Sequence, residues 1–391
     1  MNNIVGKPAR GKDFYGRAEE VNRLAQMTET DHILLLAPRR VGKTSLLLQL
    51  ESSLPAGGPV TGVYVSVGGV LGELEFVRAL IEAAAATPAG KPLRPGFLRR
   101  WWQRRGRQVK SVGVAGGTVE LESTATGWQE QADLAFKDLL AIDTTWLLMI
   151  DELPNMVLAL TEADPTGARA RAFLQWFRAI RQHPAGATKL RFILAGSVGL
   201  DSVTRRFAVS AAINDLRGWR LGPFDIETAD ALLAELASTY GIDLAPELRV
   251  HICAHAEWLI PYHLQIIFGA LRERVGTRTP SMSDIDDAVN ALLGQRHYFN
   301  PWDERLGAAV GRPHDQHARS LLTACTTDGA GVTMATLRHA LIKGIPDAAE
   351  REKAISWILD VLVNDGYLVA DGDRWRFRSG LLKRYWQRYF G

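Results

Sequence analysis

Short apolar runs alternate with amphipathic segments through the first half of the chain. Runs of about strand length, rich in Val, Ile and Leu, occur at 33–37, 60–67, 146–150 and 191–196. Segments with helical spacing begin near Ala18 and cover 44–54, 71–86 and 166–182. Strands that alternate with helices along a chain are typical of a parallel sheet flanked by helices. The pattern therefore predicts an α/β core over residues 1–224.

The pattern changes after Phe224, where helical periodicity replaces the strands. Residues 225–275 are expected to form three helices, the polar stretch 276–283 marks a boundary, and a further helix covers 284–296. This predicts a helical lid over 225–300.

The last unit, 301–391, has the element order of a winged helix-turn-helix. Helices are expected from about His317, at 333–341 and at 348–365, followed by a hairpin that turns at Asp371-Gly372 and by a final helix.

A basic and aromatic segment interrupts the α/β pattern at about 88–129. It carries Trp101 and Trp102 among arginines between Arg99 and Arg107, then two short strands around Gly116-Gly117. We expect a hairpin insertion. The arginine–tryptophan run could contact nucleic-acid phosphates and stack on bases, or its tryptophans could pack on the sheet while its arginines face solvent.

Composition places the chain among ordinary globular proteins. With 391 residues it is longer than one typical domain, and 47% hydrophobic and 23% charged residues allow a sizeable core. The formal net charge of +3 neither indicates nor excludes a nucleic-acid partner. Two cysteines cannot form a disulfide framework, and the apolar runs are too short to cross a membrane. We expect a cytoplasmic protein without a membrane partner.

The apolar run at 33–37 ends in APRRVGKT, which matches the P-loop pattern except that Ala37 replaces the first glycine. A strand before and a helix after this pattern are the context that a phosphate-binding loop requires. Lys43 is expected to reach the β- and γ-phosphates and Thr44 to bind Mg²⁺, while Gly42 lets the backbone approach the phosphates. The candidate loop residues are Pro38, Arg39, Arg40, Val41, Gly42, Lys43, Thr44 and Ser45.

A second candidate site element is the strand 146–150, which ends in Asp151 and Glu152. At the carboxyl end of a parallel strand, Asp151 would hold Mg²⁺ and Glu152 would polarise the attacking water. Acids at this position also cap the following helix, which is the alternative. Ser197, after the strand 191–196, is a candidate γ-phosphate sensor or a helix cap.

Two further groups of side chains have open roles. Arg205, Arg206, Arg217 and Arg220 could act as an arginine finger on a neighbouring subunit, or lie on the surface. His251 and His255 are four residues apart on a predicted helix, with Cys253 between them. No acid accompanies them locally, so we expect lid packing rather than a metal site.

Several boxes together resemble the archaeal-type ATPases of the STAND class within the AAA+ group. They are FYGRAEEVNRL, APRRVGKTSLLLQL, LLMIDELPNM, FILAGSVGL and LGPF, in that order. The resemblance implies ATP as the nucleotide. It also implies that Phe14, Tyr15, Gly16 and Arg17 line the adenine side, and that Pro261 belongs to a lid element that senses the nucleotide. This chain has no glycine before Pro261.

Two functional classes follow from these features. One is a switch ATPase that couples its nucleotide state to conformational change, self-assembly or a protein partner. The other is an ATPase that assembles on DNA. Its candidate DNA contacts are the Arg99–Arg107 run and Arg374, Arg376 and Arg378 of the hairpin, since arginines of a winged helix can contact phosphates.

Overall fold

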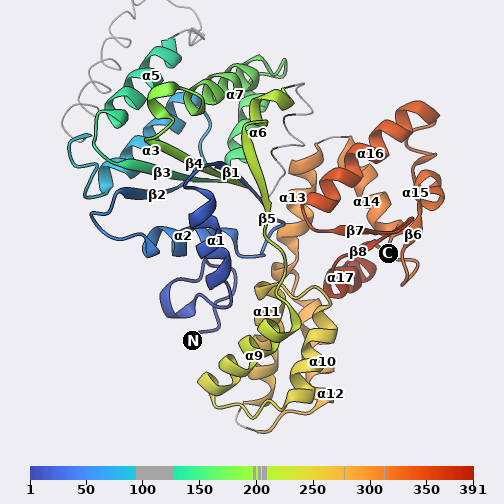
Figure 1. The fold of residues 1–391 in the computed structure, drawn as a ribbon. Helices are drawn as coiled ribbons and strands as arrows, with labels where there is room; N and C mark the ends of the chain where they lie inside the picture. Colours follow the sequence, from blue (N-terminus) through green and yellow to red (C-terminus); the bar gives the residue numbers. More distant parts are fainter. Residues whose placement is uncertain (94–126, 197–199, 201–203, 205–208, 277, 312) are drawn as a thin grey trace, which may run out of the picture.

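The computed structural model describes residues 1–93, 127–196, 200, 204, 209–276, 278–311 and 313–391 (Figure 1). The expected hairpin at 88–129 and the Arg99–Arg107 run lie largely or wholly outside these residues, as do Ser197, Arg205 and Arg206.

A five-stranded parallel sheet in the order β2-β3-β4-β1-β5 forms the centre of the first unit. Its strands are β1 His32–Leu36, β2 Val60–Ser66, β3 Thr145–Asp151, β4 Leu190–Gly196 and β5 Leu216–Arg220. The first four confirm the predicted strands. The fifth was not predicted, because an exposed edge strand of sequence LRGWR has no apolar run.

Helices cover both faces of this sheet (Figure 1). α1 Ala18–Met27 and α2 Lys43–Ser53 lie on one side, and α5 Gly127–Leu140, α6 Leu153–Ala163 and α7 Ala168–Arg181 lie on the other, with α3 Glu73–Ala86 beside α5. Buried aromatic rings, among them Phe76, Phe173 and Phe177, stack edge to face or in parallel between α3 and α7. The sheet and these helices match the P-loop NTPase fold class expected from the sequence.

The lid consists of the helices α9 Ile226–Tyr240, α10 Pro246–Ala256, α11 Pro261–Val275 and α12 Met282–Gly294. Asp225 caps α9 by accepting a hydrogen bond from the Thr228 N–H. Ser281 and Asp284 form a capping box at the start of α12. The polar stretch 276–283 is thus the end of one helix and the start of the next.

The last unit has the expected winged helix-turn-helix order. Its helices are α13 Asn300–Val310, α14 His314–Ala324, α15 Met334–Leu341, α16 Ala348–Asn364 and α17 Gly380–Phe390. β6 Val332–Thr333, β7 Leu368–Asp371 and β8 Arg374–Phe377 form a sheet in the order β6-β8-β7. Asp371 pairs with Arg374 across the hairpin, where Gly372 has a φ of 61°.

Short 3₁₀ turns occupy Gly11–Asp13, Pro184–Gly186, Ser210–Ile213 and Arg296–Tyr298. Among the described residues, no helix combines the length and hydrophobicity that a bilayer span requires.

The three units meet at Gly366, which precedes the hairpin of the winged helix. A Cβ built on Gly366 would lie 2.6 Å from Cβ of Pro38 in the core and 2.7 Å from the Trp258 ring in the lid. The Arg39 guanidinium donates a hydrogen bond of 2.9 Å to the Pro301 carbonyl nearby. We call this junction of Pro38, Arg39, Trp258, Pro301 and Gly366 the three-unit seam.

Replacing Gly366 by alanine tests this packing. Its φ is 85°, and the added methyl would overlap Pro38 and Trp258, so we expect a loss of roughly 2–4 kcal/mol in the free energy of unfolding. Gly372→Ala is the matched control, because its φ is 61° but its Cβ would meet no described atom within 4 Å, which leaves a backbone cost of about 1 kcal/mol. Urea unfolding of both variants measures the difference. Equal losses would contradict close packing at the seam.

Candidate nucleotide-binding site

The predicted phosphate loop leaves β1 at Leu36 and enters α2 at Lys43. Gly42 has a φ of 109°, and a Cβ built on it would meet no described atom within 4 Å. The loop therefore faces open space with bare backbone, which is the arrangement that lets phosphate oxygens approach N–H groups.

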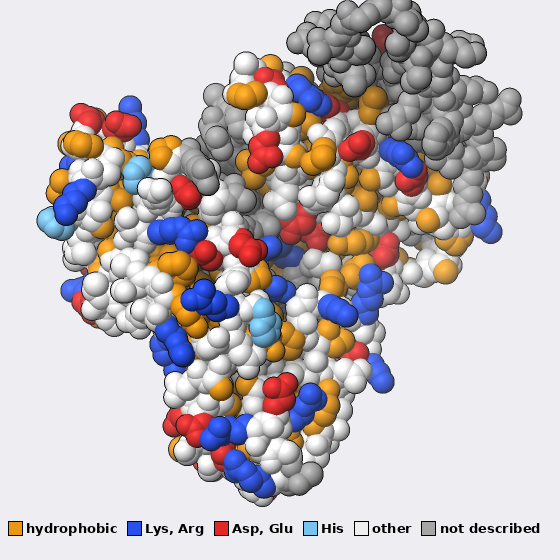
Figure 2. All heavy atoms as spheres, turned by 180° about the vertical axis from the view of Figure 1, so that it is seen from behind, with side chains coloured by type: hydrophobic (Ala, Val, Ile, Leu, Met, Phe, Trp, Pro, Cys, Tyr) orange, Lys and Arg blue, Asp and Glu red, His pale blue; other side chains and the backbone are white. Residues whose placement is uncertain are grey.

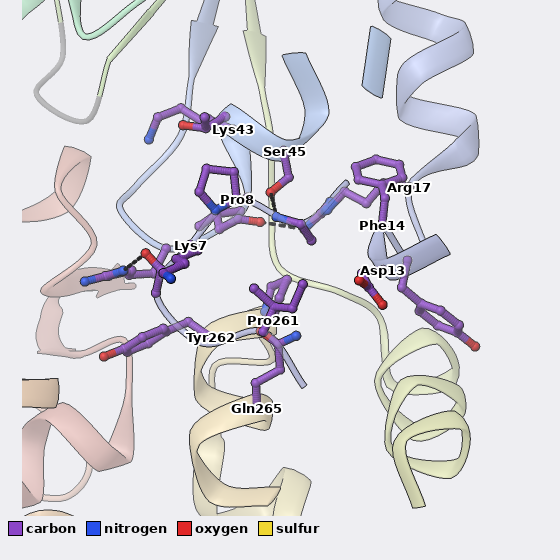
Figure 3. Close-up of a pocket in the computed structure, with 18 of the residues that line it drawn as sticks. Lys7, Pro8, Asp13, Phe14, Arg17, Lys43, Ser45, Pro261, Tyr262 and Gln265 are labelled. Carbon is purple, nitrogen blue, oxygen red and sulfur yellow. Dashed lines mark hydrogen bonds between the residues drawn. The ribbon is translucent and has the colours of Figure 1, made fainter. Parts of the chain in front are cut away.

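A cavity of about 300 Å³ opens in front of this loop (Figure 3). The loop contributes residues 39–45, the N-terminal segment contributes residues from 1 to 17, and the lid contributes Leu232, Pro261, Tyr262 and Gln265, with Phe224 at the end of the core beside them. Glu152 also reaches the cavity. Its walls thus come from segments that are far apart in the sequence.

Lys43 is buried at the start of α2, with 6% of its surface exposed. Its Nζ donates hydrogen bonds of 2.6 Å to the Ala37 carbonyl and 2.9 Å to the Pro38 carbonyl. The ammonium group is thereby held against its own loop. Because it also lines the cavity, an anion placed there would meet a buried cation at a helix N-terminus.

Thr44 and Asp151, the two residues expected to hold Mg²⁺, lie in contact with each other. The Thr44 hydroxyl donates a 2.7 Å hydrogen bond to Oδ2 of Asp151, and the Tyr64 hydroxyl lies 3.3 Å from the same oxygen. Burial raises the pKa of Asp151, and the bond from Thr44 opposes that rise. A hydroxyl and a carboxylate are hard oxygen ligands of the kind that Mg²⁺ prefers, so the pair fits the expected metal.

Tyr64 was not foreseen as a site residue. It points the same way as Ser66, which lies opposite Asp151 in the register of β2 and β3. Burial and the neighbouring Asp151 raise the pKa of Tyr64, so its hydroxyl stays protonated and donates. The alternation of side chains along β2 places Tyr64 and Ser66 on one face of the sheet. The sequence does not show that β2 pairs with β3, so it could not place this face beside Asp151.

Glu152 occupies a strained position between β3 and α6. Its φ is 63°, and its N–H donates a 3.0 Å hydrogen bond to Oδ1 of Asp151. The Asn155 amide donates a 2.6 Å hydrogen bond to Oε2 of Glu152. A left-handed conformation at a non-glycine residue is a mark of functional sites, and Asn155 fixes the direction of the carboxylate. Sequence reasoning missed Asn155.

The N-terminal segment closes one side of the cavity, which the sequence did not indicate. The Ala9 N–H donates to the Ser45 hydroxyl at 3.0 Å, and the Arg40 guanidinium donates to the Gly6 carbonyl at 3.3 Å. The Asn3 amide donates to the Gln265 carbonyl of α11 at 3.0 Å. Figure 3 shows Lys7 and Pro8 of this segment between the loop and the lid.

The residues expected on the adenine side divide into two groups. Phe14 and Tyr15 line the cavity. Gly16 makes a turn against the lid instead, since a Cβ there would lie 2.4 Å from Cγ2 of Thr228. Arg17 reaches the cavity wall but is buried, and it donates 2.7 Å to the Gly222 carbonyl.

The lid meets the phosphate loop through residues next to Pro261. Pro261 lines the cavity even though no glycine precedes it. The Arg40 guanidinium lies 4.6 Å from the centre of the Tyr262 ring, a cation–π contact between loop and lid. Pro38 packs at the three-unit seam, and Arg39, which also lines the cavity, bonds to Pro301 there.

Of the four candidate finger arginines, two are described. Arg217 forms an ion pair with Asp31 at 2.9 Å, near the start of β1. Arg220 is exposed and lies opposite Leu36 in the register of β5 and β1, at the edge where the phosphate loop begins. The sheet therefore places Arg220, and not Arg217, on the side of the nucleotide cavity.

Comparison with known proteins was informative at the level of three-dimensional structure. No family model matches the chain, and no curated protein matches it in sequence. The structure is similar to the Walker-type ATPase PABY2304 of Pyrococcus abyssi, with a TM-score of 0.63 at 16% identity over 99% of this chain and 100% of that one.

The ORC2 protein of Aeropyrum pernix, in its ADPNP–ADP complexes, is also similar, with a TM-score of 0.52 at 13% identity. That similarity covers 99% of this chain and 97% of ORC2. The fold is that of a P-loop NTPase. This confirms the expected fold class, including the C-terminal winged helix.

The buried charge of Asp151 predicts a pH-dependent stability. Because burial raises the pKa of Asp151, the folded state binds more protons than the unfolded state between the two pKa values. The free energy of unfolding therefore falls as the pH rises from the unfolded-state pKa to the folded-state pKa of Asp151. Above that range the buried charge destabilises the folded state by its full amount. Asp151→Asn is expected to stabilise the nucleotide-free protein near neutral pH, with a gain that shrinks toward about pH 4.

Urea unfolding at both pH values measures this gain. Asp143→Asn is the matched control, because the Asp143 side chain is fully exposed and lies 3.8 Å from Lys189. A loss of stability in Asp151→Asn near neutral pH, with the control unchanged, would show that the bonds to the carboxylate outweigh its burial.

Proposed function

We propose that this protein binds Mg·ATP in the cavity before the phosphate loop and hydrolyses it slowly as a conformational switch. The observation that carries the proposal is the position of the loop. Arg40 contacts the lid, Pro38 and Arg39 contact the winged helix, and residues 39–45 of the same loop line the cavity. The residues that would bind the phosphates therefore share one short loop with the contacts to both other units.

The proposed binding roles follow from the contacts. Lys43 would exchange its two carbonyl partners for phosphate oxygens, which are stronger charge-assisted acceptors. Thr44 and Asp151 would hold Mg²⁺, which supplies charge neutralisation at the phosphates when bound. Phe14 and Tyr15 offer apolar surface to a base on the opposite side of the cavity.

Glu152 is the proposed general base. It reaches the cavity beside the loop, and Asn155 holds its carboxylate through Oε2. The other carboxylate oxygen would accept a hydrogen bond from a water and orient it toward the γ-phosphate. Release of phosphate would then allow Lys43 to return to the Ala37 and Pro38 carbonyls and so change the backbone at the three-unit seam.

We place the proposed unit boundaries near residues 224 and 300, where the lid and the winged helix begin. Contacts cross these boundaries at several places, among them Asn3 with Gln265, Arg40 with Tyr262 and His255 with Arg384. A nucleotide-dependent motion of the units would have to exchange these contacts as well as those of the three-unit seam.

The alternative of an ATPase that assembles on DNA receives less support from the winged helix. Arg374 donates to Asp328 at 3.1 Å and to the Gly331 carbonyl at 2.7 Å, and Arg376 donates to Asp371 at 3.2 Å. Arg378 is only partly exposed and lies 5.5 Å from the centre of the Trp258 ring in the lid. These arginines have partners within the chain that DNA phosphates would have to replace.

The charge pattern supports the same ranking. On the face shown in Figure 2, basic and acidic side chains of the described residues are interspersed. A DNA-binding face is typically a continuous basic patch. We therefore favour the switch, with nucleotide-dependent self-assembly or a protein partner as its output.

ATP turnover with Glu152→Gln tests the proposal. The variant is expected to keep nucleotide affinity within a few-fold, since an amide preserves the shape, and to lose about 100-fold or more in turnover. Lys43→Ala should instead lose nucleotide binding. Unchanged turnover in Glu152→Gln would show that Glu152 is not the general base.

Adding duplex DNA at moderate salt separates the two functional classes. A switch should turn over slowly whether or not DNA is present. A rise in wild-type turnover with DNA, absent in Glu152→Gln and lost at higher salt, would favour the alternative.

A further inference from the structure

Two histidines of the lid converge with an aspartate that is distant in sequence. His251 and His255 lie one turn apart on α10, and Asp286 lies on the adjacent α12. Nε2 of each histidine is 2.7 Å from Oδ1 of Asp286, and the two Nε2 atoms are 3.3 Å apart. Asp286 is the acid that the local sequence around the histidines lacked.

The side chains are arranged more like metal ligands than like a simple interhelical hydrogen bond. Two ring nitrogens face each other while sharing one carboxylate oxygen, so two N–H groups directed at that oxygen would crowd each other. Ligand atoms around a tetrahedral zinc ion are separated by about 3.3 Å. The two nitrogens have that spacing, and Asp286 would need to withdraw by about half an ångström.

The surroundings leave room for a further ligand. The side chains of His251, His255 and Asp286 are 29%, 18% and 49% exposed, so the cluster opens to solvent. Glu247 lies one turn before His251 on α10, and both line a shallow hollow beside the cluster. Cys253, although between the histidines in sequence, is buried and takes no part.

We propose that His251, His255 and Asp286 form a binding site for a divalent transition-metal ion, with zinc as the best match. Two imidazoles and one carboxylate suit zinc, whereas Mg²⁺ and Ca²⁺ prefer all-oxygen sites. Water or Glu247 would complete the coordination. This site is separate from the nucleotide cavity, which contains none of the three residues.

Metal binding at this site would act on the winged helix through Arg384 of α17. The Arg384 guanidinium is 3.2 Å from Nδ1 of His255 and donates to the His255 carbonyl at 3.2 Å. Arginine only donates, so Nδ1 must be the acceptor and a neutral His255 carries its proton on Nε2. A metal at Nε2 requires the proton on Nδ1 instead. The metal and this arginine contact therefore exclude each other.

Metal titration of the purified full chain tests the site. After treatment with a chelator, and with excess Mg²⁺ to occupy carboxylates elsewhere, Co²⁺ is titrated by visible absorption and Zn²⁺ by competition with a chromophoric chelator. We expect one saturable site with tetrahedral or five-coordinate Co²⁺ bands. His251→Gln, His255→Gln and Asp286→Asn should each weaken metal binding by at least about tenfold. Removing a metal ligand should weaken binding at least as much as removing a residue that only hydrogen-bonds to a ligand.

Matched controls exclude general effects of the substitutions. Asp287→Asn alters the next acid on α12, which pairs with Arg274, and should leave metal affinity unchanged. Circular dichroism and thermal melts identify any variant that fails to fold, and zinc should raise the melting temperature of wild type but not of Asp286→Asn. Saturable binding with equal affinity in all three ligand variants, or no saturable binding by wild type, would overturn the proposal.

Arg384→Met tests the coupling to the winged helix. Removing a donor and a positive charge beside His255 should tighten zinc binding several-fold. In wild type, zinc should increase protease cleavage between α12 and α17. Unchanged or weaker zinc affinity in Arg384→Met would refute the claim that metal binding and the contact between Arg384 and His255 exclude each other. The metal site itself is decided by the three ligand variants.

Discussion

A buried lysine at the amino end of a helix is the constraint on which the core depends. The α2 helix presents its positive end where Lys43 is also positive, so two like charges share a site with little solvent. The carbonyls of Ala37 and Pro38 compensate part of this cost. A bound triphosphate would compensate both positive charges at once. The electrostatics of the loop therefore favour an anion in the cavity, and they explain why Lys43 bonds to carbonyls of its own loop in this structure.

The same loop also takes part in the contacts between the units. Its outward-facing side supplies Pro38 to the seam with Gly366 and Trp258, and Arg39 to Pro301. The carbonyl of Pro38 is one of the acceptors that Lys43 would release. Packed interfaces shift between discrete arrangements rather than deforming continuously. In the proposed switch, a small backbone change here would therefore leave the seam either closed or open.

Local chemistry explains what the sequence could predict. Four strands, the phosphate loop, Asp151 and the winged-helix order were recognisable because each depends on a contiguous pattern of apolar residues or turn residues. The edge strand β5 was missed because its exposed residues have no such pattern. The N-terminal wall, Tyr64 and Asn155 were missed because their roles arise from tertiary contacts, such as the bond from Ala9 to Ser45.

Two of the contacts between the lid and its neighbours would respond to different chemistry. Tyr262 at the start of α11 stacks on Arg40 of the phosphate loop, and His255 near the end of α10 bonds to Arg384 of the winged helix. Only four residues separate the end of α10, at Ala256, from the start of α11, at Pro261. Trp258, in this short connection, packs against the seam. A nucleotide would act on the contact between Arg40 and Tyr262, and a metal ion on the contact between His255 and Arg384. Both contacts flank the short connection that contains Trp258. Loss of either contact would therefore weaken the packing of Trp258 at the seam, which the other contact supports.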